Sequence, residues 1–138
     1  MQTDCFLDTN VLLYAAAGRA DHPSKFRRAT ALIIEGNFGI STQVLQEFFA
    51  NATSKPVMGP MAVGEAVGWI ERLERQPCVL VDPPLIKIAI ALSQRYRINY
   101  WDGAILAAAE RLGAEIVYTE DLNHGQTYGP VRVVNPFL

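Results

Sequence analysis

The sequence has 138 residues, of which 50% are hydrophobic and 19% are charged, and its formal net charge is −2. This length and composition predict one globular domain, covering residues 1–138, with a buried apolar core, and they exclude a disordered chain. The negative charge excludes a protein that holds nucleic acid by bulk positive charge alone, but not a nuclease whose acidic site binds cations.

Short β-type runs alternate along the chain with segments whose apolar residues repeat at helical spacing. The β-type runs are residues 5–7, 38–40, 78–81, 115–118 and 131–134. The helical stripes are Leu45, Phe48, Phe49 and Ala52, then Leu85, Ile88, Ala89, Leu92 and Tyr96, and finally Trp101, Ile105, Ala108 and Leu112. This alternation predicts an α/β fold in which a parallel sheet of about five strands is sandwiched between helices.

Local chemistry predicts several boundaries of these elements. Asp82 followed by Pro83 suits the N-cap and the first position of a helix. Gly36 and Gly113 stand where a left-handed residue would end a helix. Residues 58–60 (MGP) are expected to break the chain before the next helical segment.

The sequence contains neither the ~20-residue apolar run that spans a bilayer nor a basic start followed by an apolar stretch, as in a signal peptide. We therefore expect a cytoplasmic protein that does not enter a membrane. Cys5 and Cys78 lie in apolar runs with no histidine close by in the sequence. We expect them to be buried, reduced thiols with a structural role.

Four acidic residues are expected at one edge of the predicted sheet. Asp8 follows the first strand and Asp121 follows the fourth, and the carboxyl ends of parallel strands meet at the same edge. Glu47 lies one helical turn after Gln43, on a face without apolar residues. Asp102 opens the helix that precedes the fourth strand, where it can either cap the helix or face the same edge.

Taken singly, these acids also have structural explanations. Asp8 can cap a helix over residues 11–17, Glu47 can be a solvated helix residue, and Asp121 can form a turn. Together the four acids indicate a cation-binding site, because like charges that lie close together destabilise a fold unless a cation neutralises them. A set made only of carboxylates favours Mg²⁺ or Mn²⁺, and no histidine or cysteine pattern indicates zinc.

Four segments resemble, in order, the motifs of PIN-domain nucleases. They are residues 4–14 (DCFLDTNVLLY), 46–48 (QEF), 100–109 (YWDGAILAAA) and 118–126 (YTEDLNHGQ), and the ending 134–137 (VNPF) resembles the VapC-type toxins of that family. The resemblance implies a PIN-like fold, a metal-filled acidic pocket and endoribonuclease activity. It also implies roles for individual residues: the catalytic and metal-holding acids are Asp8, Glu47, Asp102 and Asp121, and the supporting polar residues are Asn10 and Thr119.

The sequence therefore predicts an endoribonuclease that depends on Mg²⁺ or Mn²⁺ and hydrolyses RNA phosphodiesters with metal-activated water. The resemblance further implies the toxin of a toxin-antitoxin pair, with RNA as substrate, a cognate antitoxin protein as partner, and a homodimer. The small and apolar residues of the run 57–68 could supply the dimer surface.

Other functions remain open at this point. A PIN-like protein could bind RNA or a partner without cutting it. An aspartyl-phosphate phosphatase would use Asp8, but it would need a general acid where this chain has Asn10. A response-regulator receiver would need paired acids after the first strand and a lysine after the last one, and the sequence has neither.

Several residues near the motifs are assigned to structural roles. Glu120 is expected to point away from the pocket, because neighbours at a strand end alternate. His124 is expected to be a solvent-facing loop residue rather than a phosphate contact. Trp69 and Trp101 are expected in the core, since both lie in apolar helical spacing. A basic cluster, which either steers RNA phosphates or forms a solvated surface, comprises Arg19, Lys25, Arg27 and Arg28.

Overall fold

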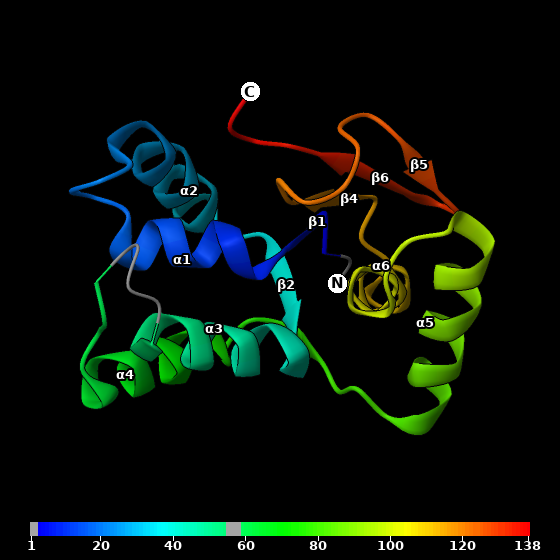
Figure 1. The fold of residues 1–138 in the computed structure, drawn as a ribbon, viewed down its shortest axis with the longest axis horizontal. Helices are drawn as coiled ribbons and strands as arrows, with labels where there is room; N and C mark the ends of the chain where they lie inside the picture. The colour runs from blue at the N-terminus through cyan, green and yellow to red at the C-terminus, as the bar shows by residue number, and fades with distance from the viewer. Residues whose placement is uncertain (1–2, 55–58) are drawn as a thin grey trace.

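The computed structural model of the chain describes residues 3–54 and 59–138. At its centre is a six-stranded sheet with the order β3-β2-β1-β4-β6-β5, enclosed by helices (Figure 1). Residues 57 and 58, which begin the run 57–68 and include the Met58 of the predicted break, lie outside the described residues, as do residues 1 and 2. None of the helices within residues 3–54 and 59–138 combines the length and the apolar character of a bilayer-spanning segment.

All five predicted β-type runs form strands, and a sixth strand joins them. The strands are β1 (Cys5–Leu7), β2 (Phe38–Ser41), β3 (Cys78–Val79), β4 (Ile116–Tyr118), β5 (Thr127–Tyr128) and β6 (Val131–Val134). All pairs are parallel except β5 with β6, which is antiparallel, so the sheet is mostly rather than wholly parallel. The predicted run 78–81 ends early because its partner strand β2 ends at Ser41, which pairs with Val79, and beyond this point the Val81 amide donates to the Thr42 hydroxyl.

The helices alternate with the strands as the sequence predicts. They are α1 (Thr9–Ala17), α2 (Pro23–Glu35), α3 (Thr42–Ser54), α4 (Val63–Leu73), α5 (Pro83–Tyr96) and α6 (Tyr100–Leu112). The predicted cap at Asp82 is confirmed, since its carboxylate accepts a hydrogen bond from the Leu85 amide at 3.0 Å. The left-handed helix ends are also confirmed at Gly36 and Gly113, with φ of 77° and 83°.

The arrangement of α6 explains how the fold holds its acidic edge in place. Residues 103–109 of α6 are all buried, so this helix has no solvent face over two turns. It packs against α5 and against β2, β3, β4 and β6, and in Figure 1 it is seen end-on between α5 and the strands. The buried stretch anchors α6, and Asp102 lies directly before it.

The two thiols differ slightly from the expectation. Cys5 and Cys78 are unpaired, but they are partly rather than fully buried. Burial raises the pKa of the Cys5 thiol to about 11 and also raises that of Cys78. Neither thiol is therefore activated as a nucleophile at neutral pH.

Candidate active site

A pocket of about 270 Å³ opens where β1 and β4 end, and all four predicted acids line it. Its walls come from α1, α3, the first turn of α6 and the segment after β4. The lining residues include the acids Asp8, Glu47, Asp102, Asp121 and Glu120, together with Thr9, Asn10, Tyr14, Gln43, Asn51 and Trp101. The strand ends and helix starts thus bring together residues from four distant parts of the chain.

Asp8 both caps a helix and faces this pocket. One of its carboxylate oxygens accepts a hydrogen bond from the Thr9 amide at 2.7 Å, which caps α1. The other accepts a hydrogen bond from the Thr119 hydroxyl at 2.8 Å. Burial raises the pKa of Asp8 to about 7, and the negative charges of Asp121 and Glu47 contribute to the rise. The structural and the functional explanation of Asp8 are therefore compatible.

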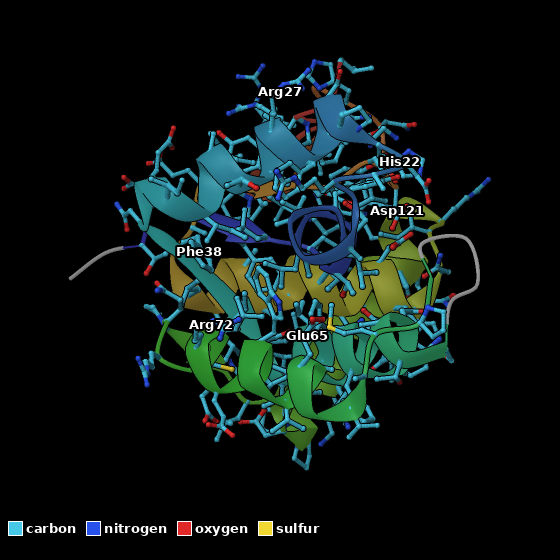
Figure 2. The ribbon with its side chains drawn as sticks, turned by 90° about the vertical axis from the view of Figure 1, so that its left-hand side faces the viewer. His22, Arg27, Phe38, Glu65, Arg72 and Asp121 are labelled. Atoms are coloured by element: carbon cyan, nitrogen blue, oxygen red, sulfur yellow. The ribbon has the colours of Figure 1, made fainter. Side chains whose placement is uncertain are left out.

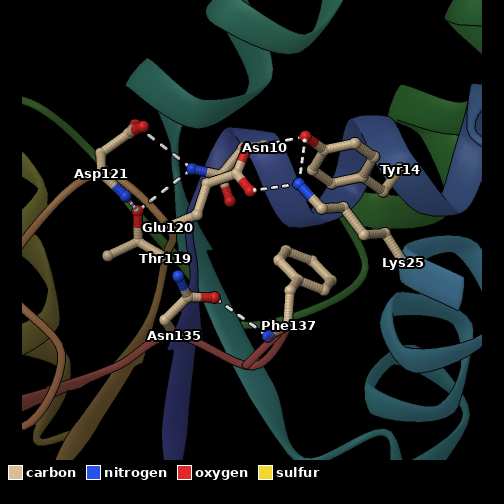
Figure 3. Close-up of polar contacts among 8 residues, drawn as sticks. All are labelled: Asn10, Tyr14, Lys25, Thr119, Glu120, Asp121, Asn135 and Phe137. Atoms are coloured by element: carbon tan, nitrogen blue, oxygen red, sulfur yellow. Dashed lines mark hydrogen bonds and ion pairs between the residues drawn. The ribbon is translucent and has the colours of Figure 1, made fainter. Parts of the chain in front are cut away.

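The Thr119 hydroxyl connects three residues of the pocket, and Figure 3 shows its contacts with two of them, Asn10 and Asp121. Besides donating to Asp8, its Oγ1 accepts hydrogen bonds from the Asn10 amide group and from the Asp121 backbone amide, both at 3.1 Å. The Asn10 amide group also donates to the Asp121 carboxylate at 3.2 Å. Thr119 is completely buried and Asp121 is exposed, so the Asp8 end of this arrangement is shielded from water and the Asp121 end is open to it.

Glu47 is held from two helices. Its carboxylate accepts a hydrogen bond from the Thr9 hydroxyl of α1 at 2.9 Å. The Gln43 amide group, one turn earlier on α3, donates to it at 3.5 Å. The predicted pairing of these two α3 residues is therefore confirmed.

Asp102 does not cap α6, so that alternative is wrong. The cap is Asn99, whose side-chain oxygen accepts a hydrogen bond from the Asp102 backbone amide at 2.8 Å. The Asn99 amide group in turn donates to the Asp102 carboxylate at 2.9 Å, a reciprocal arrangement that resembles a capping box. Burial, followed by the charges of Asp121 and Glu47, raises the pKa of Asp102.

The expectation that Glu120 points away from the pocket is wrong. Its carboxylate accepts hydrogen bonds from the Tyr14 hydroxyl at 2.8 Å and from the Lys25 ammonium at 3.0 Å, and it lines the pocket wall (Figure 3). Strand β4 ends at Tyr118, so strand alternation no longer governs Glu120. Sequence reasoning missed Tyr14, although its spacing of one helical turn from Asn10 could have indicated it.

The expectations for the two tryptophans and for His124 have mixed outcomes. Trp69 is partly buried against the Phe48 ring, whereas Trp101 is 61% exposed, so its assignment to the core is wrong. His124 is an exposed loop residue, as expected, and its Nδ1 accepts a hydrogen bond from the Asn135 amide at 3.0 Å.

The predicted basic cluster divides in the structure. Lys25 pairs with Glu120 at the pocket wall. Arg28 donates to the Pro136 carbonyl at 3.3 Å. Arg27 extends outward from α2 in Figure 2, away from Asp121, as a solvated side chain does.

The chemistry of the pocket fits a hard divalent cation. Its donors are carboxylate oxygens, and the side-chain oxygen Oδ1 of Asn10, a lining residue, is buried without a hydrogen-bond partner among the residues that the structure describes. Within residues 3–54 and 59–138, no basic side chain lines this pocket. Nor does that part of the chain hold three acidic, histidine or cysteine side chains close enough to form a ready-made metal site. Lys25 compensates Glu120, but no ion pair is found for the four predicted acids among the described residues, so they gather negative charge that a cation would neutralise.

Comparisons with known proteins find a family model and solved structures that are similar to this chain. The family model described as PIN domain matches residues 5–130. No curated protein sequence matches the chain. A structure described as a toxin-antitoxin complex from Klebsiella pneumoniae is similar with a TM-score of 0.71 and 20% identity, over 96% of this chain and 98% of that chain.

Two further solved structures are similar in fold. VapC20 of Mycobacterium tuberculosis, described as a sarcin-ricin loop cleaving toxin, has a TM-score of 0.65 and 19% identity, over 86% of this chain and 90% of that chain. DNA-bound VapBC from Salmonella typhimurium has a TM-score of 0.65 and 18% identity, over 96% of this chain and 97% of that chain. At such identities the likeness establishes the α/β fold that the sequence predicts.

Proposed function

Because the chain belongs to the PIN domain family, we propose that it is an endoribonuclease dependent on Mg²⁺ or Mn²⁺, and the toxin of a toxin-antitoxin pair. The observation that carries this proposal is the convergence of Asp8, Glu47, Asp102 and Asp121 on one pocket. The family supports a metal-dependent nuclease, and the similar folds of toxins support the biological class.

In this proposal the four carboxylates hold the cations, and their neighbours keep them in position. A bound divalent cation supplies Lewis acidity and positive charge at the phosphodiester. Thr119 orients Asp8, and Asn10 orients Asp121, each by a direct hydrogen bond. Such supporting contacts restrict the ligands before the metal arrives, which favours binding and catalysis.

The local geometry disfavours a phosphatase that uses Asp8 as a nucleophile. Such an enzyme needs a general acid two residues later, and the Asn10 amide group instead donates to Thr119 and Asp121. Binding of RNA without cleavage is disfavoured by the negative charge of the pocket, because a phosphate would be repelled in the absence of a cation.

Site-directed variants test the enzymatic proposal. Cleavage ends are first mapped in total RNA from cells that express the protein, and the mapped RNA is then cut with purified protein in Mg²⁺ or Mn²⁺. Asp121→Asn and Glu47→Gln are expected to lower the rate ~10²–10³-fold, because each removes an anionic metal ligand. Glu115→Gln, an exposed charge outside the pocket, is the matched control and should leave the rate unchanged.

Two results would contradict the enzymatic proposal. One is cleavage of the mapped RNA by well-folded Asp8→Asn protein at the wild-type rate. The other is undiminished cleavage in excess EDTA. An intact, folded protein that cuts no RNA in either metal would favour the binding function instead.

The proposed partner is an antitoxin protein that inserts an arginine or lysine beside Asp8 and Asp102. The uncompensated carboxylates of the pocket attract a guanidinium, which can bind a carboxylate in bidentate fashion. Similar folds are found in toxin-antitoxin complexes, which supports such a partner. A structure of the complex with the co-encoded protein tests this, and a partner bound only on the far surface, with every acid hydrated, contradicts it.

A further inference from the structure

Trp101 is exposed in a place where a structural role does not explain it. Its side chain is 61% accessible, although it immediately precedes Asp102 and the buried stretch of α6. The Tyr100 ring packs against the indole at 5.0 Å between centroids, with the two planes at 79°. This contact supports the indole from one direction and leaves most of its surface in water. A large aromatic surface held open beside an acidic pocket is suited to a ligand.

A hollow of about 350 Å³ adjoins the indole. Its lining residues are Gln43, Gln46, Glu47, Ala50 and Trp101. Three of them, Gln43, Glu47 and Trp101, also line the acidic pocket. The hollow, called here the Trp101 hollow, is therefore continuous with the proposed catalytic pocket.

Gln43, which lines the Trp101 hollow, carries a polar atom without a hydrogen-bond partner among the described residues. The residue is only 5% exposed, and its amide nitrogen donates to the Trp101 carbonyl at 3.2 Å and to Glu47 at 3.5 Å. Both partners can only accept, so they fix the orientation of the amide. Its oxygen Oε1 is buried with no hydrogen-bond partner among the described residues. Buried acceptors are normally paired, so this oxygen favours a ligand that brings a donor.

We propose that the Trp101 hollow binds one nucleobase of the RNA substrate, next to the phosphodiester that is cut. This inference rests on the proposed function. The base stacks on the indole of Trp101, and its edge donates an N–H group toward Gln43. A base fits better than a phosphate, because the Glu47 carboxylate lines the hollow and no basic residue does so in the described part of the chain.

The proposal restricts the substrate to RNA that is unpaired at the cleavage site. In an A-form duplex the bases are stacked on each other and paired, so none can enter the Trp101 hollow. Gln43 also links the Trp101 backbone to Glu47, so the stacked base has a fixed position relative to a proposed metal ligand. Trp101 would thus position the RNA strand.

Binding without turnover provides the first test. In an Asp121→Asn background, a labelled short RNA of one fixed sequence without self-complementarity is titrated with protein in Mg²⁺, and anisotropy is measured. Trp101→Ala is expected to weaken binding about 5- to 150-fold, which corresponds to ~1–3 kcal/mol at 1.4 kcal/mol per tenfold. Trp101→Phe should retain most of the affinity. Ile34→Ala, at a 77% exposed position on α2, is the matched control.

The same RNA annealed into a duplex separates stacking from a nonspecific effect. Trp101→Ala should not change duplex binding. Unchanged single-strand affinity, or an equal loss for single strand and duplex, would overturn the proposal. Trp101 is largely exposed, so its variants should fold, and thermal unfolding verifies this.

Cleavage kinetics provide the second test and separate the two proposals. In the otherwise wild-type protein, Trp101→Ala should raise KM for single-stranded RNA by the same factor and change kcat less. Normal cleavage with an unchanged KM refutes only the base-binding role. If the wild-type protein cuts no RNA, the proposed function fails, and the anisotropy experiment still decides whether Trp101 binds a base.

Discussion

At the scale of single residues, the Thr119 hydroxyl controls the geometry of the acidic pocket. A hydroxyl can donate one hydrogen bond and accept two, and Thr119 uses all three. It donates to Asp8 and accepts from Asn10 and from the Asp121 amide. The hydroxyl therefore has no hydrogen-bonding capacity left for water or substrate, and the contribution of Thr119 is to position the acids.

Removing this hydroxyl should affect both activity and stability. Thr119→Val keeps the shape but removes three hydrogen bonds: one to the second carboxylate oxygen of Asp8, one from the Asn10 amide group and one from the Asp121 backbone amide. We expect the rate of RNA cleavage to fall about 10- to 100-fold and the free energy of unfolding to fall by about 1–3 kcal/mol. Initial rates and urea denaturation measure the two effects. Thr119→Ser restores the hydroxyl and should recover most of both, and wild-type activity in Thr119→Val would refute the positioning role.

Asp8 should make the stability of the metal-free protein depend on pH. Burial raises its pKa to about 7 in the folded protein, from the ordinary value of 3.8 that applies to the unfolded chain. The folded state therefore binds the proton more tightly, so the stabilisation is complete below pH 3.8 and is lost as pH rises through about 7. Urea denaturation in EDTA across this range should show the decline.

The control for this pH dependence is Asp8→Asn, in which the decline should become shallower. The diagnostic quantity is the slope of the free energy of unfolding against pH, not its absolute value. The absolute value also changes in this variant, because an amide at this position would place a second donor against the Thr119 hydroxyl. Mg²⁺ should offset the decline, since it binds the ionised carboxylate. An identical slope in both proteins would mean that Asp8 is not the titrating group.

At the scale of elements, the sequence could predict the acids because their placement follows from general geometry. Asp8 directly follows β1 and Asp121 comes three residues after the end of β4, and the two strands pair in parallel, so the proximity of these acids needs no detailed packing. Glu47 was tied to Gln43 by helical spacing alone. Strand ends and helical repeats are local properties, and they survive in any α/β arrangement.

Residues beyond the element ends could not be predicted in the same way. Helical periodicity placed Trp101 on an apolar stripe, but it lies in the first turn of α6, before the helix enters the core. Glu120 was assigned by strand alternation, yet β4 has already ended. Its direction depends on Tyr14 and Lys25, which lie far away in the sequence. Only tertiary contacts settle such positions.

The close packing of α5 against α6 makes a prediction at this scale. A Cβ added at Gly103 would lie 2.6 Å from the Ala89 carbonyl oxygen, a backbone atom that cannot move independently. Gly103→Ala should therefore push the start of α6 away and lower the free energy of unfolding by about 1–3 kcal/mol. Because Asp102 is adjacent, RNA cleavage should fall as well.

Gly64→Ala is the matched control for this substitution. A Cβ there would meet nothing within 4 Å, on helix α4. Replacing a helical glycine by alanine should stabilise the protein by about 0.5–1 kcal/mol. Urea denaturation should thus move the two variants in opposite directions, and a stable Gly103→Ala protein would contradict the packing argument.

At the scale of the whole molecule, the strand order lies beyond what the sequence pattern predicts. β6 inserts between β4 and β5, so the hairpin that closes the sheet places its antiparallel strand at the edge. β5 has only two residues, Thr127 and Tyr128, too few to show a periodic pattern. The position of β5 is fixed by packing instead, since the buried Tyr128 ring packs against the Tyr96 ring of α5 with 5.0 Å between the ring centroids.

The predicted homodimer can be tested on the outer helices. Of the run 57–68, the described part includes Val63, which is 59% exposed, and Val67, which is 39% exposed one turn later on α4. Helix α5 has a comparable pair, Ile86 and Ile90, at 37% and 47%. Either pair could be covered by a second copy, and the sequence argument favours α4.

Light scattering at high micromolar concentration should therefore give about twice the chain mass of 15.2 kDa. The double variant Val63→Glu with Val67→Glu should shift the protein to a monomer, because burying two carboxylates against each other in a symmetric interface is unfavourable. The matched variant Ile86→Glu with Ile90→Glu should remain a dimer. If only the α5 variant dissociates, the interface lies on α5 and the prediction from run 57–68 is wrong. If the wild-type protein is a monomer at this concentration, the dimer prediction itself fails.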